Sequence, residues 1–397
     1  MAFGLRRDVL RPSDSARADR VTYVELFFDL VFVFALTQLS AYLYAHQTPL
    51  GALEGALMVC ALWWAWVSMT WVTNWLDPVK LPVRGAVIAL AFVALVMSVA
   101  IAEAFGDRAW AFALSYVVLQ LGRTGLLVWA LWRHDRPVAR DFACVLAWTG
   151  LASAFWVVGA LLPLPAQLPF WGAALAVELA GTLLGYPVPG LGRLRLGGWD
   201  VSGPHIAERS ALFVLIAIGE GILVAGFAFV DLESSVASTT AMANAFVMAA
   251  ALWWIYFDHG ERVGAETIER APEPARLART AYTFVHLLVI AGVVVTSVAD
   301  KELLGHPDER GLAAFTVVLG GPALFLAGTA LFRRVVAGRW PIAHLCGVLA
   351  FAALAVVAGA VADATPLAIG LGATLVLVAV AAAETVDRLR RGRRSGG

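Results

Sequence analysis

The stretch VELFFDLVFVFALTQLS, residues 24–40, decides the fold, because it is typical of a membrane-spanning helix yet carries a carboxylate inside its apolar run. A charged side chain is costly in hydrocarbon, so Asp29 is expected to face protein or water and is a functional candidate. At about 100° per residue, Glu25, Asp29 and Ser40 fall on one face of the helix, and Gln38 lies opposite. The stretch therefore predicts a helical membrane protein whose first span has a polar face.

The composition supports this class and excludes others. Hydrophobic residues make up 60% of the 397 positions, charged residues 15%, and the mean hydropathy is +0.79, which predicts a multi-pass protein in the lipid bilayer rather than a soluble one. The 29 basic and 29 acidic residues balance, which argues against a nucleic-acid partner. No cofactor is predicted, because the chain lacks a phosphate-binding glycine loop and the common metalloprotease, hydrolase and paired-cysteine motifs.

Twelve apolar runs are long enough to cross about 30 Å of hydrocarbon. They lie near residues 24–45, 50–73, 84–103, 109–132, 141–162, 168–187, 208–230, 240–258, 279–299, 311–333, 341–361 and 366–386. The expected fold is an all-α membrane protein of about twelve helices. The expected domains are a basic N-terminal segment (1–23), a first six-helix half (24–187), a linker (188–207), a second six-helix half (208–386) and a basic tail (387–397).

The positions of the basic residues predict the orientation. Of the 29 Lys and Arg residues, only Arg108, Lys301 and Arg310 fall in the odd-numbered loops, Arg123 lies within a span, and the others lie in the tails and even-numbered loops. Positive charge accumulates on the cytoplasmic side of membrane proteins. We therefore expect a protein of the cell (inner) membrane with both termini in the cytoplasm.

The two halves show signs of an internal repeat. Leu62-Trp63-Trp64 recurs as Leu252-Trp253-Trp254, and several matches in later helices recur about 200 positions downstream. An even number of helices per half makes such repeats parallel, which is a transporter-like architecture. A comparison with the major facilitator transporters is an analogy at the level of the fold.

Charged and polar side chains on the fourth span suggest a partner for Asp29. Tyr116, Gln120 and Arg123 share one stripe of that span, and Arg123 lies at about the depth of Asp29. The simplest neutral arrangement is an ion pair between Arg123 and Asp29. Such a pair either lines a path for a solute or proton or is purely structural.

Three further spans carry single ionisable residues. Glu220 lies near mid-membrane between Gly219 and Gly221, and either takes part in proton coupling or holds helices together as a protonated carboxyl. Glu178 lies on the sixth span and is more typical of a close helix contact than of a binding wall. His286 lies on the ninth span, where it is either a core residue or a proton relay.

Tryptophans lie too deep in two spans to belong to an interfacial aromatic belt. Trp63 and Trp64 on the second span, together with Trp253 and Trp254 on the eighth, form a candidate aromatic wall for an organic or cationic solute.

A cluster at the cytoplasmic ends of the seventh and eighth spans offers a weak alternative site. His205, Glu208, Asp258 and His259 are possible metal ligands of an intramembrane enzyme, although solvated helix-end charges are the preferred interpretation and no metal is predicted.

The motif E-L-F-F-D-L-V-F-V-F-A-L-T-Q-L at residues 25–39 closely resembles that of the bacterial low temperature requirement A family. Residues 205–209, HIAER, and 253–258, WWIYFD, are similar to its second and third signatures. The residues at the motif positions are Glu25, Asp29, Gln38, His205, Glu208, Arg209, Glu220 and Asp258. The resemblance covers essentially the whole chain. The family is named for a cold-growth phenotype, so the resemblance implies the family and does not specify a biochemical activity.

These observations lead to one main hypothesis and two alternatives. The main hypothesis is a secondary transporter of a small solute or ion, coupled to H⁺, in which Asp29 and Arg123 form a gating or substrate-contacting pair and Glu220 is protonatable. The alternatives are a non-transporting membrane protein that supports growth in the cold and the intramembrane metalloenzyme. Transport predicts a central polar cavity reached by Asp29 and Glu220.

Overall fold

The computed structural model describes residues 9–11, 20–132, 134–194, 202–258, 267 and 271–395. Within these residues the secondary structure is helical, apart from turns and two isolated bridges. The described part contains 12 helices that are long and apolar enough to cross a membrane. The all-α membrane class with about twelve spans is therefore confirmed.

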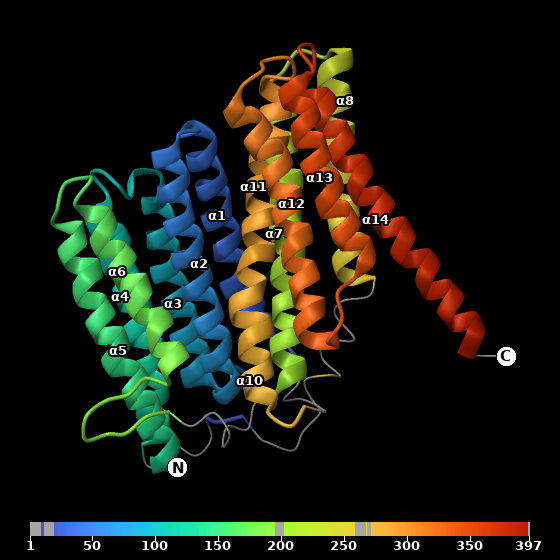
Figure 1. Cartoon of the computed structure of the whole chain (residues 1–397). Helices are drawn as coiled ribbons and strands as arrows, with labels where there is room; N and C mark the ends of the chain where they lie inside the picture. Colours follow the sequence, from blue (N-terminus) through green and yellow to red (C-terminus); the bar gives the residue numbers. More distant parts are fainter. Residues whose placement is uncertain are drawn as a thin grey trace. The chain divides into compact units, whose positions relative to one another are not determined.

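Figure 1 shows the helices in chain order. Those before residue 200 are α1 (Tyr23–Ala45), α2 (Pro49–Trp75), α3 (Leu81–Ala100) with the short η1 (Ile101–Glu103), α4 (Ala109–Leu131), α5 (Arg136–Ala160) and α6 (Gln167–Leu184). Those after it are α7 (Gly203–Val230), α8 (Val236–Phe257), α10 (Pro274–Ala278), the π-helix η3 (Arg279–Val285), α11 (His286–Gly305), α12 (Leu312–Ala337), α13 (Ile342–Ala360) and α14 (Pro366–Ser395).

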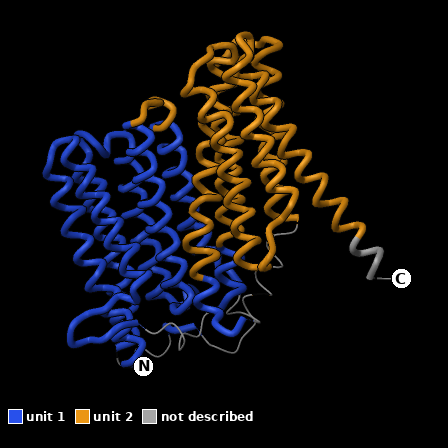
Figure 2. Tube along the Cα trace, in the orientation of Figure 1, with its two compact units in different colours: residues 1–42, 50–209, 271–278 blue, residues 43–49, 210–270, 279–397 orange. Residues whose placement is uncertain are grey.

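The chain divides into two compact units (Figure 2). Unit 1 comprises residues 1–42, 50–209 and 271–278, and unit 2 comprises residues 43–49, 210–270 and 279–397. In unit 1, α4 packs against both α3 and α5, and α5 packs against α6; in unit 2, α11 packs against α12, and α14 packs against α8 and α13. This division into compact units tests neither the expected domain boundaries nor the parallel repeat, and both stay predictions.

Local sequence explains where two helices depart from their predicted bounds. α5 begins at Arg136, before the expected residue 141, because the Asp135 side chain accepts a hydrogen bond from Val138 N (3.1 Å) and Pro137 occupies the first turn. α14 continues to Ser395, beyond the expected residue 386, because its basic end contains leucine and arginine, which favour helix. The segment expected as a basic tail therefore begins as a continuation of α14.

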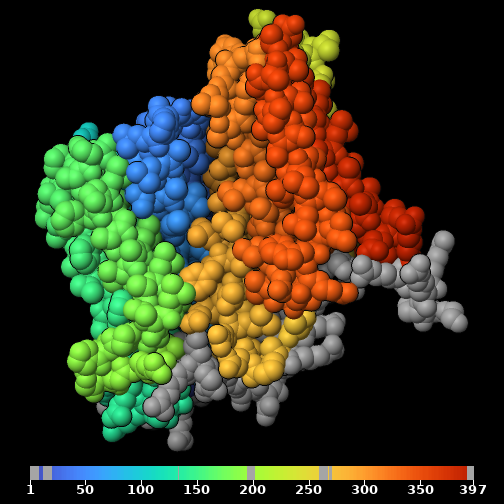
Figure 3. Space-filling model, viewed as in Figure 1, coloured from blue at the N-terminus to red at the C-terminus, as the bar shows by residue number. Residues whose placement is uncertain are grey.

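The surface of α13 is apolar, as a helix in contact with lipid requires. Leu345, Leu349, Val356 and Val357 on this helix are 41–70% exposed. Figure 3 shows α13 and α14 at the surface of unit 2, in orange-red and red. These apolar side chains are not buried within the protein, so they are suited to contact with the hydrocarbon of the bilayer.

Glycines bring α11 and α12 into close contact in unit 2. A Cβ atom on Gly292 would lie 2.4 Å from Phe325 N, and one on Gly321 would lie 2.5 Å from Thr296 N. Only glycine permits the two backbones to approach so closely. This contact fixes α11, which carries several of the buried polar residues of unit 2.

Candidate functional site

Asp29 is held by two donors in the interior of unit 1. It lies on α1 and is fully buried, and its Oδ1 accepts hydrogen bonds from Arg209 Nη2 (2.6 Å) and Trp66 Nε1 (2.7 Å). The guanidinium of Arg209 also lies 5.6 Å from the centre of the Trp66 ring. The predicted ion pair between Asp29 and Arg123 is therefore wrong: the partner of Asp29 is Arg209.

The helix α7 begins at Gly203, before the expected start of the seventh span at residue 208. Arg209 therefore lies inside this helix rather than at its end, and it is fully buried. A guanidinium that has no access to water needs an anionic partner. The same correction applies to His205, which is also fully buried.

Glu25, one turn before Asp29, collects a second set of partners in unit 1. Its Oε1 lies 2.9 Å from His205 Nε2 and 3.6 Å from Arg209 Nη1. Its Oε2 accepts hydrogen bonds from the Thr22 backbone N–H (2.9 Å) and hydroxyl (2.8 Å). Glu25 is thus a fully buried carboxylate whose two oxygens are both satisfied.

The N-terminal segment supplies a further cation to this site. Arg11 Nη2 donates to both oxygens of Glu25 (3.2 Å each) and lies 3.0 Å from His205 Nε2. Its backbone is fixed as well, because Arg11 N donates to Trp75 O (2.9 Å) at the end of α2. Burial lowers the pKa of Arg11, and the neighbouring Glu25 carboxylate opposes that shift.

Arg11, Glu25, Asp29, His205 and Arg209 together form what we call the charge cluster. Its two arginines and two carboxylates balance, which is what burial in a membrane protein demands. The cluster also retains unused hydrogen-bonding capacity. Asp29 Oδ2 and Arg209 Nε are buried and have no hydrogen-bond partner in the described part of the chain. These two atoms, an acceptor and a donor, are therefore available to a water molecule or to a polar ligand.

A second polar network in unit 1 uses the predicted stripe of α4. Tyr116 OH and Gln120 Nε2 donate to the two oxygens of Glu178 on α6, at 2.8 and 3.1 Å. Arg123 Nε donates to Gln120 Oε1 (2.8 Å), and Arg123 Nη1 donates to Ser68 O (3.4 Å). Tyr116, Gln120 and Arg123 thus belong to one hydrogen-bonded network, whose carboxylate is Glu178 rather than Asp29.

In unit 2, Glu220 is paired with a hydroxyl. Ser297 Oγ on α11 donates to Glu220 Oε2 on α7 (3.1 Å), and Glu220 is 1% exposed. Asp300 lies one turn further along α11 and is 5% exposed.

His286 has the partners of a core residue. Its Nε2 lies 2.8 Å from Tyr256 OH and its Nδ1 lies 2.9 Å from Ala281 O, so both ring nitrogens are occupied. The ring is fully buried against Tyr282 and Phe332. A role in proton relay stays a prediction.

Sequence reasoning missed an ion pair near the end of α14 in unit 2. Arg333 Nη2 on α12 donates to Glu384 Oε2 (2.9 Å), and His344 Nδ1 lies 3.0 Å from Glu384 Oε1. Two features of the sequence could have indicated this pair: Glu384 lies within the last apolar run, and Arg333 lies at the end of the tenth run.

The four deep tryptophans differ in their surroundings. Trp63 and Trp64 are buried in unit 1, where Trp63 stacks on Trp66. Trp253 and Trp254 are 42% and 44% exposed on unit 2. An aromatic wall formed by all four stays a prediction.

The other motif positions have local partners. Glu208 accepts a hydrogen bond from Val21 N (3.1 Å), and Gln38 is half-buried on α1. Asp258 pairs with Arg388 Nη1 (2.6 Å). Within the described residues no group of three or more histidine, cysteine, aspartate and glutamate side chains is arranged to hold a metal. His259, the fourth residue of the metal alternative, lies outside the described residues.

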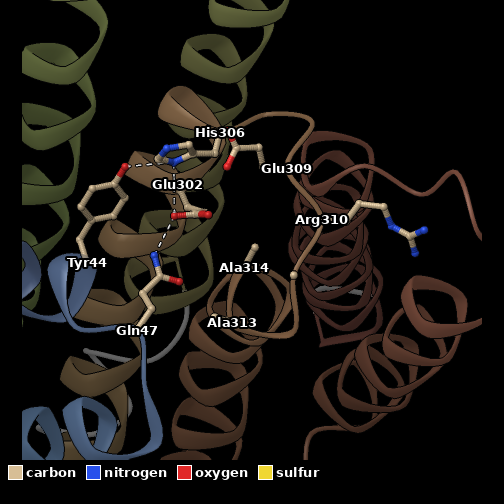
Figure 4. A pocket seen from close by; sticks show the side chains of 9 residues that line it. Tyr44, Gln47, Glu302, His306, Glu309, Arg310, Ala313 and Ala314 are labelled. Atoms are coloured by element: carbon tan, nitrogen blue, oxygen red, sulfur yellow. Dashed lines mark hydrogen bonds and ion pairs between the residues drawn. The ribbon is translucent and has the colours of Figure 1, made fainter.

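Unit 2 also contains a pocket of about 320 Å³. Figure 4 shows Tyr44, Gln47, Glu302 and His306 linked around it, with the Arg310 side chain turned away. Gln47 Nε2 donates to Glu302 Oε2 (2.8 Å), and Tyr44 OH lies 3.2 Å from His306 Nδ1. Neither Asp29 nor Glu220 lines this pocket, so the central cavity stays a prediction.

The chain matches the family model "Bacterial low temperature requirement A protein (LtrA)" over residues 20–382. It is 37% identical over 375 residues to an uncharacterized protein of Rhizobium meliloti (strain 1021), an alignment that covers 94% of this chain and 91% of the relative. No solved structure matches it. The charge cluster includes four of the positions that the sequence motifs singled out, Glu25, Asp29, His205 and Arg209. The chain belongs to the bacterial low temperature requirement A family.

Proposed function

We propose that this protein is a secondary transporter that moves a small solute or ion across the cell membrane, coupled to protons. The observation that carries the proposal is the charge cluster, in which four of the five residues lie on candidate membrane spans. Within the described residues, Asp29 Oδ2 and Arg209 Nε have no hydrogen-bond partner. Buried ion pairs contribute little net stability compared with apolar packing, so stability alone does not explain their presence. Ionisable residues within spans commonly line substrate or proton paths.

The proposed roles follow from the contacts of each residue. Asp29 and Arg209 are the substrate-contacting or gating pair, because the free Asp29 Oδ2 and Arg209 Nε are available to a polar ligand. Glu220 is the protonatable site. The Arg123 network with Glu178 is assigned to the structure of unit 1, because Glu178 already accepts from both of its neighbours on α4.

A second candidate function is support of growth in the cold without transport, as the family description suggests. The complete pairing of Glu25 and Glu178 favours it, because a purely structural protein is expected to satisfy all its buried carboxyls. Asp29 Oδ2 has no such partner in the described residues. That difference is why we place transport first.

The test is proton flux in liposomes. Purified protein is reconstituted with a pH-sensitive dye inside the vesicles, and a panel of small solutes is added outside. We expect one or more solutes to drive proton movement in the wild type. The flux should fall at least about tenfold in Asp29→Asn and Glu220→Gln, since each variant removes a charge from a path that must change its charge during transport.

Matched controls separate a transport defect from a general effect of losing a carboxylate. Asp363→Asn and Glu233→Gln make the same chemical changes at exposed positions, and both should keep the wild-type flux. If no solute moves protons and the buried variants only unfold at lower temperature, transport is wrong. The cold-growth role then takes its place.

A further inference from the structure

Asp300 is a buried carboxyl without a partner in the described part of the chain. It is 5% exposed on α11, and no described residue forms a hydrogen bond or ion pair with it. An ionised carboxylate at such a position is strongly disfavoured unless a proton or another cation is supplied. A proton or another cation is therefore needed to neutralise Asp300, because no described side chain forms an ion pair with it.

Two oxygen-bearing side chains among the described residues, Glu220 and Ser297, are associated with Asp300. An ionised Glu220 on α7 would repel an ionised Asp300. Ser297 precedes Asp300 by one helical turn, so their side chains share a face of α11, and its hydroxyl donates to Glu220 Oε2 (3.1 Å). Two carboxyls and one hydroxyl thus gather between α7 and α11 inside unit 2.

The Ser297 hydroxyl is suited to a second interaction. Its hydrogen is directed to Glu220 and to Val293 O (3.1 and 3.3 Å), so its oxygen lone pairs can still accept a proton donor or coordinate a cation. The backbone beside it leaves room for this arrangement. A Cβ atom on Gly221 would lie 2.8 Å from Ser297 Oγ, whereas one on Gly219 would meet nothing within 4 Å.

From this geometry we propose that Glu220, Ser297 and Asp300 form a binding site for one monovalent cation, either H⁺ or Na⁺. Two neighbouring carboxylates in a low-dielectric interior repel each other, and a single shared cation relieves the repulsion. Oxygen ligands favour hard cations. A divalent metal fits less well, because no described group offers three acidic, histidine or cysteine ligands.

The proposal deepens the transport function, since its role as the coupling site rests on that function. Binding itself is independent of transport and is measured on the full-length protein in detergent, without a membrane gradient. A protein that binds the cation but drives no flux in liposomes would contradict transport alone. Flux without binding at these residues would contradict this site alone.

The first experiment compares thermal unfolding in sodium chloride and in choline chloride at equal ionic strength. If Na⁺ is the ligand, the wild-type midpoint rises with the logarithm of the Na⁺ concentration. The rise should be lost in Asp300→Asn and Ser297→Ala. It should persist in Asp363→Asn, which changes an exposed aspartate.

The second experiment detects the proton. If H⁺ is the ligand, infrared spectra near neutral pH show the C=O stretch of a protonated carboxyl, and the band is lost or shifted in Asp300→Asn and in Glu220→Gln. A wild type with neither a Na⁺-specific rise nor such a band overturns the site.

The adjacent glycines give a test that does not remove a carboxyl. Gly221→Ala displaces Ser297 and should weaken the Na⁺ rise or shift the band, whereas Gly219→Ala should leave both as in the wild type. This pair decides the question if the carboxyl variants fail to fold. Retention of the full signal in Gly221→Ala would then contradict the proposal.

Discussion

The charge of the buried Asp29 is compensated by an ion pair, but one of its two carboxylate oxygens lacks a hydrogen bond. Arg209 and Trp66 donate to the same oxygen, while the second oxygen is left over. The ion pair removes the net charge, but the unused acceptor keeps a local cost. The ionised form of Asp29 is compensated only while Arg209 is present, so mutation of Arg209 measures the contribution of the pair to stability.

We expect Arg209→Gln to lower the free energy of unfolding by about 3–5 kcal/mol, because it leaves Asp29 as an uncompensated buried charge. The double variant Asp29→Asn/Arg209→Gln removes both charges and should regain about 1–3 kcal/mol of that loss. Thermal or denaturant unfolding in detergent measures both.

The control is Arg276→Gln, which breaks an exposed ion pair with Glu273 (3.3 Å) and should cost less than about 1 kcal/mol. Equal stability of Arg209→Gln and the wild type would show that the ion pair between Asp29 and Arg209 contributes nothing to the free energy of unfolding.

At the residue scale the sequence could identify the candidates but not their partners. Asp29 was predictable because a carboxylate among phenylalanines has no other explanation than a buried role. Its partner was not, because Arg123 and Arg209 lie on different helices, and the hydropathy pattern does not say which faces α1. Arg11 gave no signal, since an arginine in a polar N-terminal segment is usually solvated.

At the scale of elements, the contact of α11 with α12 depends on glycines at particular positions. We expect Gly321→Ala to destabilise the protein by about 1–3 kcal/mol, since its new methyl group would overlap the backbone of Thr296. Unfolding in detergent by circular dichroism measures the loss.

The neighbouring residue provides the control for this contact. Gly320→Ala adds the same methyl group where nothing lies within 4 Å, so its stability should change by no more than about 1 kcal/mol. Similar losses in the two variants would mean that helix propensity, rather than close packing, sets the effect.

The spans themselves were predictable, because hydropathy over a helix length depends on composition alone. Their ends were less so: the start of α5 depends on a cap at Asp135, and the end of α14 on the helix preference of a basic tail. The π-helix that leads into His286 has no counterpart in an apolar pattern, since its hydrogen bonds are set by packing.

For the whole molecule, the distribution of basic residues predicts which side of the membrane each loop faces. The loops at the two ends of α13 contain the exposed residues Arg339 and Asp363. Single cysteines at these positions, in a background without Cys60, Cys144 and Cys346, should label in opposite ways. A membrane-impermeant maleimide should reach Asp363→Cys in intact cells.

The same reagent should reach Arg339→Cys only after the cells are opened. Labelling of both positions in intact cells would contradict the crossing by α13. Exchange of the two patterns would place the termini outside the cell.

The distance along the chain between Asp29 and Arg209 has a consequence for biosynthesis. Arg209 follows Asp29 by 180 residues. At a translation rate of about 5–20 residues per second, α1 is made about 10–40 s before its counter-charge. During that interval its carboxylates have no guanidinium from α7, and their cost in hydrocarbon opposes full insertion of the first span until α7 emerges from the ribosome. Cells that translate slowly at low temperature would lengthen this interval in proportion.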